Sequence, residues 1–114
     1  MILEGFVGVP YEGRHFCRVF AGKVLAANGV DMPHVVKPER AEEWDKVESP
    51  KEMDLVVFRT GPVPDHVGVC IGRGRFIHVV EGERSRIDFL SSPLWSGIIE
   101  GFYRFKGASA CKAS

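Results

Sequence analysis

The sequence lacks an excess of either charge and has no long hydrophobic run. Fifteen basic residues balance fifteen acidic residues, whereas proteins that bind nucleic acid or anionic membranes depend on an excess of positive charge. Nowhere do about 18 apolar residues follow one another, as a membrane-spanning helix requires. We therefore expect neither a nucleic-acid partner nor a membrane partner.

Cysteines are few, and Cys17, Cys70 and Cys111 are widely spaced without a CxxC pair. An odd number without close pairs supports neither a disulfide framework nor a zinc-finger pattern. A reducing compartment is the simpler interpretation. The first residues also lack the basic segment and the apolar run of an export signal. We therefore expect the protein to be cytoplasmic as synthesised.

The chain does have the composition of one folded domain. It has 114 residues, of which 45% are hydrophobic and 26% are charged, which is unlike a disordered protein. A domain of this length buries roughly two-thirds of its unfolded surface and can fold without disulfides or a structural metal. We predict a single domain over residues 1–106 and a flexible tail over residues 107–114.

Residues 16–28 predict a helix with Cys17 in its first turn. The periodicity of the apolar residues places Cys17 on the apolar side, facing inward or towards the rim of a cleft. At a helix N-terminus, the dipole and the unpaired backbone N–H groups favour a thiolate over a thiol. Cys17 is therefore a candidate nucleophile, and the alternative is a buried structural thiol.

The second half of the chain predicts short strands, so we expect an α+β fold with an antiparallel sheet of about five strands. Two apolar runs around Gly72-Arg73-Gly74 predict a β-hairpin. The acidic segment 39–48 predicts a surface connection with one helical turn around Trp44, and residues 91–95 predict a capped turn of helix. The predicted strands cover residues 55–58, 66–71, 75–80, 84–89 and 101–105.

Two histidines lie on the two strands of the predicted hairpin. Alternation puts His66, Gly68 and Cys70 on one face of their strand, and these small neighbours suit a cleft. His66 and His78 are candidates for a base and the group that orients it. Two alternatives stay open: His78 as a core histidine bonded to the backbone, and a zinc site, because the thiols and imidazoles of Cys17, Cys70, His66 and His78 suit zinc.

Three segments together resemble the NlpC family of papain-like cysteine peptidases, which act on bacterial cell walls. They are Pro10-Tyr11 before the helix, the run 53–58, and the hairpin H-V-G-V-C-I-G-R-G-R-F-I-H at 66–78. The hairpin is the most specific part, since it sets two histidines twelve residues apart with glycines between them. The resemblance covers residues 9–105, and the ending G-F-Y-R at 101–104 is similar to bacteriophage tail-assembly members of the family.

The resemblance implies a papain-like fold in which the nucleophile helix packs on the antiparallel sheet. It implies Cys17 as nucleophile, His66 as general base, His78 as the residue orienting it, and Tyr11 beside the oxyanion site. The expected activity is hydrolysis of peptide bonds in peptidoglycan stem peptides by a Cys-His-His triad. The resemblance implies no metal and no organic cofactor.

The residues beside the nucleophile depart from the family pattern. Phe16 stands where the family usually has Asp, Arg18-Val19 replaces the common Ser-Gly or Trp-Gly, and Met53 replaces a glycine. An alternative function is therefore a non-catalytic phage tail-assembly or cell-wall-binding module, with phage tail or cell-wall-binding proteins as partners. Another is an acyl- or amidotransferase that uses the same thiol. Each cell-wall function implies association with a virion or delivery to the wall.

Overall fold

The structure is a computed structural model that describes residues 1–32, 35 and 37–107. The predicted tail, apart from Gly107, lies outside the described residues, and so does Cys111. Within the described part of the chain, no helix is long and apolar enough to cross a membrane.

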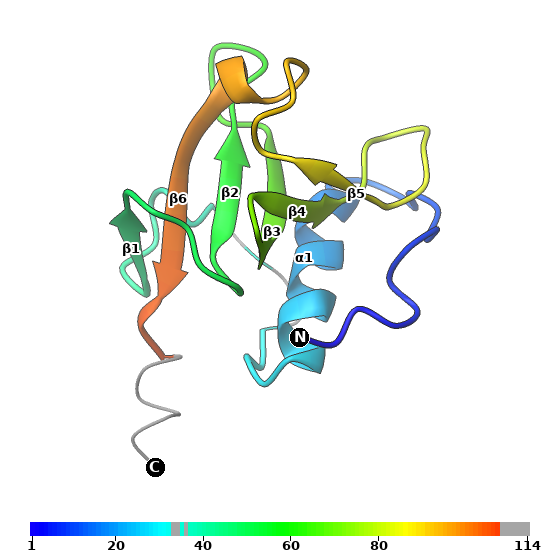
Figure 1. Ribbon diagram of the computed structural model, residues 1–114, viewed down its shortest axis with the longest axis horizontal. Coiled ribbons are helices and arrows are strands. Elements are labelled where there is room, and N and C mark those ends of the chain that lie inside the picture. The colour runs from blue at the N-terminus through cyan, green and yellow to red at the C-terminus, as the bar shows by residue number, and fades with distance from the viewer. Residues whose placement is uncertain (33–34, 36, 108–114) are drawn as a thin grey trace.

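One α-helix packs on an antiparallel sheet, as the sequence predicted (Figure 1). The helix α1 spans Phe16–Ala27, and a single turn of 3-10 helix, η1, spans Ser96–Ile98. The sheet has six strands in the order β1-β6-β2-β3-β4-β5. The strands are β1 Trp44–Val47, β2 Leu55–Phe58, β3 His66–Gly72, β4 Arg75–His78, β5 Arg86–Phe89 and β6 Ile99–Phe105.

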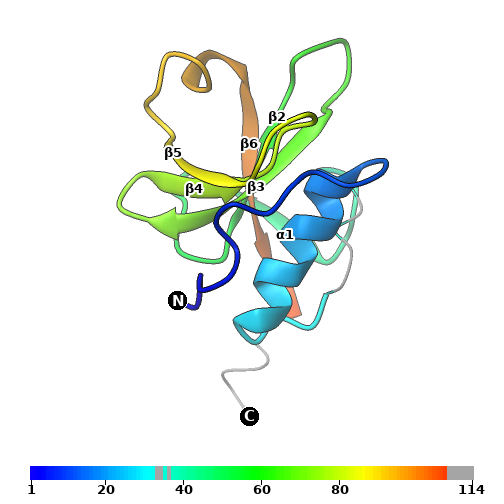
Figure 2. The ribbon, with the colours of Figure 1, turned by 90° about the vertical axis from the view of Figure 1, so that its right-hand side faces the viewer.

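The sheet separates two apolar clusters. On one face, α1 lies against β3, and Val67 and Val69 pack with helix residues such as Phe20 and Leu25 (Figure 2). On the other face, Val56, Phe58, Cys70 and Phe76 are covered by the segment that contains Trp95 and Ile98. The alternation predicted along β3 is therefore confirmed, because successive residues of a strand point to opposite faces.

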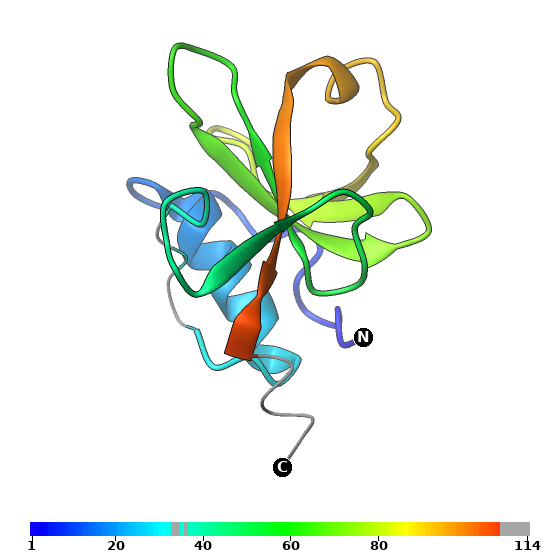
Figure 3. The same cartoon turned by 90° about the vertical axis from the view of Figure 1, so that its left-hand side faces the viewer.

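The prediction of a helical turn around Trp44 is wrong, because this residue begins β1. Its ring packs on Phe105 with centroids 5.3 Å apart, and the two residues are opposite one another across β1 and β6. Pairing with β6 gives the backbone of this segment hydrogen bonds that an isolated helical turn lacks. The strand adds an edge to the sheet, opposite β5 (Figure 3), and accounts for six strands instead of about five.

The helical turn predicted at residues 91–95 is also misplaced. The residues form turns, and the 3-10 turn η1 follows at Ser96–Ile98. The chain therefore turns back after β5 and enters β6 with Trp95 held against the sheet.

The start of β2 is fixed by a buried carboxylate. Asp54 is 2% exposed, and it accepts two hydrogen bonds from Arg104 on β6, at 2.9 and 2.8 Å. It also accepts the backbone N–H of Lys51 at 2.7 Å. The preceding Met53 has a φ of 77°, in the left-handed region that favours glycine, which is a physical reason for the glycine of the NlpC pattern at this position.

The segment before α1 crosses the molecule to the connection between β4 and β5. Ser85 donates its backbone N–H to Val9 at 2.7 Å, and Tyr11 donates its own to Glu83 at 3.1 Å. These bonds hold Tyr11 and the start of the helix near the strands that carry the two histidines.

Candidate active site

Cys17 is the second residue of α1, and the bend that precedes it is tight. His15 caps the helix in the left-handed conformation, with φ 55° and ψ 31°, and no side chain caps the first turn. The thiol residue is 5% exposed and belongs to the cluster between the helix and β3. Cys17 therefore sits at the positive end of the helix but inside the protein.

Burial raises the pKa of the Cys17 thiol above its usual value. A backbone hydrogen bond from Val67, the charge of Arg18 and the backbone of the first turn lower the pKa, but they do not outweigh burial. The backbone at the helix N-terminus thus favours a thiolate, as predicted, but burial makes the net shift favour the thiol. The hydrogen bond with the Val67 backbone places the thiol beside the residue that follows His66.

The structure joins the two histidines directly. Nε2 of His66 lies 2.8 Å from Nδ1 of His78 in a hydrogen bond between β3 and β4. Burial, with the charge of His78 as a second cause, lowers the pKa of His66 to about 3. Burial also lowers the pKa of His78. Both imidazoles are therefore neutral at neutral pH.

Tyr11 contacts the first turn of the helix. Its hydroxyl oxygen accepts the backbone N–H of Phe16 at 3.1 Å, which leaves the hydroxyl proton available to donate. The Tyr11 and Phe16 rings meet edge to face with centroids 5.6 Å apart. Phe16 is 7% exposed and packs into the core, so its bulk is directed away from solvent.

Comparisons with known proteins identify the family and the fold of the chain. The sequence model of the NlpC/P60 family matches residues 10–104. The chain belongs to the NlpC/P60 family. The bacteriophage tail-assembly branch stays a prediction, and no curated protein matches the sequence.

Two solved NlpC/P60 structures have the same fold. One, from Bacillus cereus, is 24% identical with a TM-score of 0.70, over 88% of this chain and 36% of that protein. The other, a lipoprotein-like NLP/P60 protein from Staphylococcus aureus, is 20% identical with a TM-score of 0.68, over 88% of this chain and 37% of that protein. The chain thus spans little more than a third of either protein.

The glycine in the NlpC/P60 hairpin has a steric cause. A Cβ at Gly68 would lie 2.8 Å from the ring of Phe76 and 3.2 Å from Cβ of His78. Contacts this short force a neighbour to move. Gly68 therefore lets β4 bring His78 within hydrogen-bond distance of His66.

Aromatic rings enclose the histidine pair, a feature that the sequence analysis missed. The Trp95 ring stacks on His66 with centroids 5.7 Å apart and stands edge-on to His78 at 4.7 Å. Phe58 lies 5.4 Å from His66, and Phe76 lies 4.4 Å from His78. The residues on the face of His66 are small on β3, as predicted, but neighbouring segments place aromatic rings against the histidines and reduce their contact with water.

Asp88 is a second residue that the sequence analysis missed. Its Oδ2 lies 2.7 Å from Nε2 of His78 and accepts a hydrogen bond from Nε of Arg86 at 2.8 Å. Although burial alone would raise it, the hydrogen bonds from Arg86 and His78 hold the pKa of Asp88 below its usual value. The available signal was the connection 79–85, after which β5 pairs with β4 and brings Asp88 diagonally across from His78.

A hydrogen bond does not join every pair of predicted neighbours. Within the described residues, the thiol of Cys17 makes no hydrogen bond to His66. The thiol instead has a hydrogen bond with the backbone of Val67, the residue that follows His66. No three His, Cys, Asp or Glu side chains converge as a metal site requires in that part of the chain. The alternative zinc set of Cys17, Cys70, His66 and His78 is therefore not assembled.

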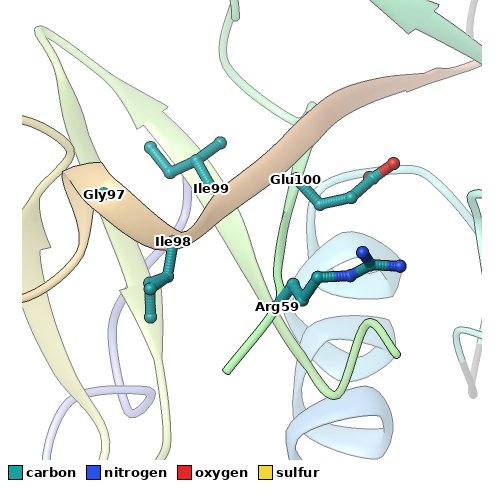
Figure 4. Close-up of a pocket in the computed structure, with 5 residues that line it drawn as sticks. All are labelled: Arg59, Gly97, Ile98, Ile99 and Glu100. Atoms are coloured by element: carbon teal, nitrogen blue, oxygen red, sulfur yellow. The ribbon is translucent and has the colours of Figure 1, made fainter. Parts of the chain in front are cut away.

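A surface pocket of about 320 Å³ lies at the ends of β2 and β6 (Figure 4). It is lined by Arg59, Gly97, Ile98, Ile99 and Glu100. Arg59 follows Phe58, whose ring contacts His66, but neither Cys17 nor His66 lines this pocket. The pocket therefore contains neither the candidate nucleophile nor the candidate base.

Proposed function

We propose that this protein is a cysteine peptidase that hydrolyses peptide bonds in peptidoglycan stem peptides. Membership of the NlpC/P60 family supports the class of substrate. The observation that carries the proposal is the hydrogen-bonded His66–His78 pair, which stands beside the helix turn that holds Cys17. Tyr11, bonded to that turn, completes the set of predicted residues.

In this proposal, the reaction starts from a neutral thiol and a neutral imidazole. His66 takes the thiol proton while the sulfur of Cys17 attacks the substrate carbonyl carbon, and the carbonyl oxygen becomes an oxyanion. The backbone N–H of Cys17 and the hydroxyl of Tyr11 are the proposed donors to that oxyanion. The C–N bond then breaks, and His66 gives its proton to the leaving amine.

The remaining thioester is then hydrolysed. Water loses a proton to His66 and attacks the thioester carbonyl, and the C–S bond breaks to release a carboxylic acid and to restore the thiol. His78 keeps His66 in one orientation through the 2.8 Å hydrogen bond. No metal ion or cofactor takes part in these steps.

Purified muropeptides and mass analysis of the products test the proposal. We expect two fragments whose masses add up to the substrate plus one water, and we expect Cys17→Ala to abolish them. Cys70→Ala is the matched control, because Cys70 is also buried but lies on the sheet face opposite α1. Cleavage that persists in Cys17→Ala would contradict the proposed nucleophile.

A second candidate is a non-catalytic module that binds cell-wall peptides or phage tail proteins. The buried thiol, whose pKa is raised and which has no hydrogen bond to His66 among the described residues, favours it. Wild-type protein that binds muropeptides without cleaving them would support this candidate over the first.

A further inference from the structure

A continuous row of hydrogen bonds crosses three strands and ends at a carboxylate. It runs from His66 on β3 to His78 on β4 at 2.8 Å, and from His78 to Asp88 on β5 at 2.7 Å. Arg86 holds the same Asp88 oxygen at 2.8 Å. Each histidine therefore meets its partner through one specified ring nitrogen.

The carboxylate end determines which nitrogen carries each proton. A neutral imidazole has one donor nitrogen and one acceptor nitrogen, and an ionised carboxylate only accepts. Nε2 of His78 must therefore carry the proton that it donates to Asp88, which makes its Nδ1 an acceptor. Nε2 of His66 must then donate to that Nδ1, and Nδ1 of His66 keeps a free lone pair.

The surroundings of the row leave few competing partners. His78 is 1% exposed, and Phe76 and Trp95 lie against its ring. The row approaches solvent at its two ends: the Asp88 side chain is 24% exposed, and His66 is partly exposed. The Asp88 carboxylate is held by Arg86, which also pairs with Glu83 at 2.5 Å. The carboxylate is thus kept ionised and oriented at the far end from the thiol.

We propose that Asp88 is a positioning residue that fixes the tautomers of His78 and His66 and so leaves Nδ1 of His66 as the base. The role of that base rests on the proposed function, whereas the tautomers do not. Asp88 touches neither the thiol nor the predicted oxyanion site, and it acts through His78. Arg86 orients the carboxylate of Asp88, but this carboxylate can accept the hydrogen bond from His78 without Arg86.

Nitrogen-15 NMR of the histidine rings at neutral pH tests this directly, because it distinguishes a protonated from an unprotonated ring nitrogen. We expect wild-type His66 and His78 each to carry the proton on Nε2. In Asp88→Ala, water replaces the carboxylate and both donates and accepts, so we expect mixed tautomers at both residues. Arg86→Ala is the matched control and keeps the wild-type tautomers, because it removes the ion pair but leaves the acceptor.

Two results would overturn the proposal. One is a proton on Nδ1 of His78 in the wild-type protein, a measurement that needs no variant to fold. The other is an Asp88→Ala protein with unchanged tautomers. A structural role for the Asp88–Arg86 pair alone would lower stability equally in both variants and leave the tautomers as they are.

The kinetic arm separates this proposal from the proposed function. For a muropeptide that the wild-type protein cleaves, we expect Asp88→Ala to lower kcat about a hundredfold with KM unchanged, since general-base catalysis is lost while the substrate still binds. A wild-type protein that cleaves nothing contradicts the proposed function, and the ring tautomers then still decide the role of Asp88.

Discussion

Two carboxylates of the same sheet are held in different ways. Asp54, at the start of β2, is 2% exposed and is surrounded by donors from Arg104 and the Lys51 backbone. Asp88, on β5, shares one oxygen between Arg86 and His78. The hydrogen bonds of Asp54 end at Arg104 and Lys51, whereas those of Asp88 continue through His78 to His66.

The difference separates a structural network from one suited to chemistry. Around Asp54, the partner is a guanidinium, which stays charged and has no acceptor nitrogen, so it cannot serve as a base. Around Asp88, the row passes through two imidazoles that are kept neutral by burial. A network of the second kind holds a base ready, and its geometry matters more to proton transfer than to the free energy of unfolding.

The largest expected effect on stability is at Asp54. Asp54→Ala leaves Arg104 without its partner and Lys51 without an acceptor, and we expect the free energy of unfolding to fall by about 3 to 5 kcal/mol. Urea denaturation measures this change. Asp45→Ala is the matched control, because Asp45 also faces a cation, Lys106 at 3.5 Å, but is 64% exposed. A loss below about 1 kcal/mol at Asp54 would place its network with ordinary surface pairs.

Much of the fold was predictable from local patterns. The helix predicted at 16–28, which ends at Ala27 in the structure, and the hairpin around Gly72 follow from apolar periodicity and turn residues, and both are confirmed. The strand at Trp44 was not predicted, because its partner Phe105 lies at the far end of the sequence. A short polar segment adopts the backbone that its tertiary neighbour stabilises, and local propensity does not reveal that neighbour.

The candidate site was predictable only in part for a similar reason. His66 and His78 stood out because they share one hairpin and the resemblance gives each a role. Asp88 and Trp95 belong to segments whose position depends on how the chain returns after β4. The raised pKa of the Cys17 thiol was missed because the degree of burial at a helix N-terminus is set by the packing of the whole domain.

An intermediate effect on stability is expected at Gly68, where an added side chain would press on His78. In Gly68→Ala, the new methyl group meets the Phe76 ring and Cβ of His78, and we expect a loss of about 1 to 3 kcal/mol in the free energy of unfolding. Gly61→Ala is the matched control, because a Cβ there meets nothing within 4 Å. Equal stability of the two variants in urea would contradict the close packing of β3 on β4.

The smallest expected effect, taken over one pH unit, is a change in the free energy of unfolding with pH that originates in the histidine row. The folded pKa of His66 is about 3, against an ordinary value of 6.5, so between these values the unfolded chain binds a proton that the folded protein does not. The free energy of unfolding therefore falls as the pH is lowered through this window, by about 1 kcal/mol per pH unit, and His66 has no effect above it. Urea denaturation at a series of pH values measures the slope.

His66→Gln sharpens the comparison between the two carboxylates, because it removes the titrating ring and leaves the Asp54 network intact. We expect this variant to lose most of the slope that His66 supplies, although His78, whose pKa burial also lowers, contributes with the same sign. Equal slopes in wild type and His66→Gln would mean that His66 is protonated alike in the folded and the unfolded chain, and the row would then resemble the Asp54 pair in holding no neutral base.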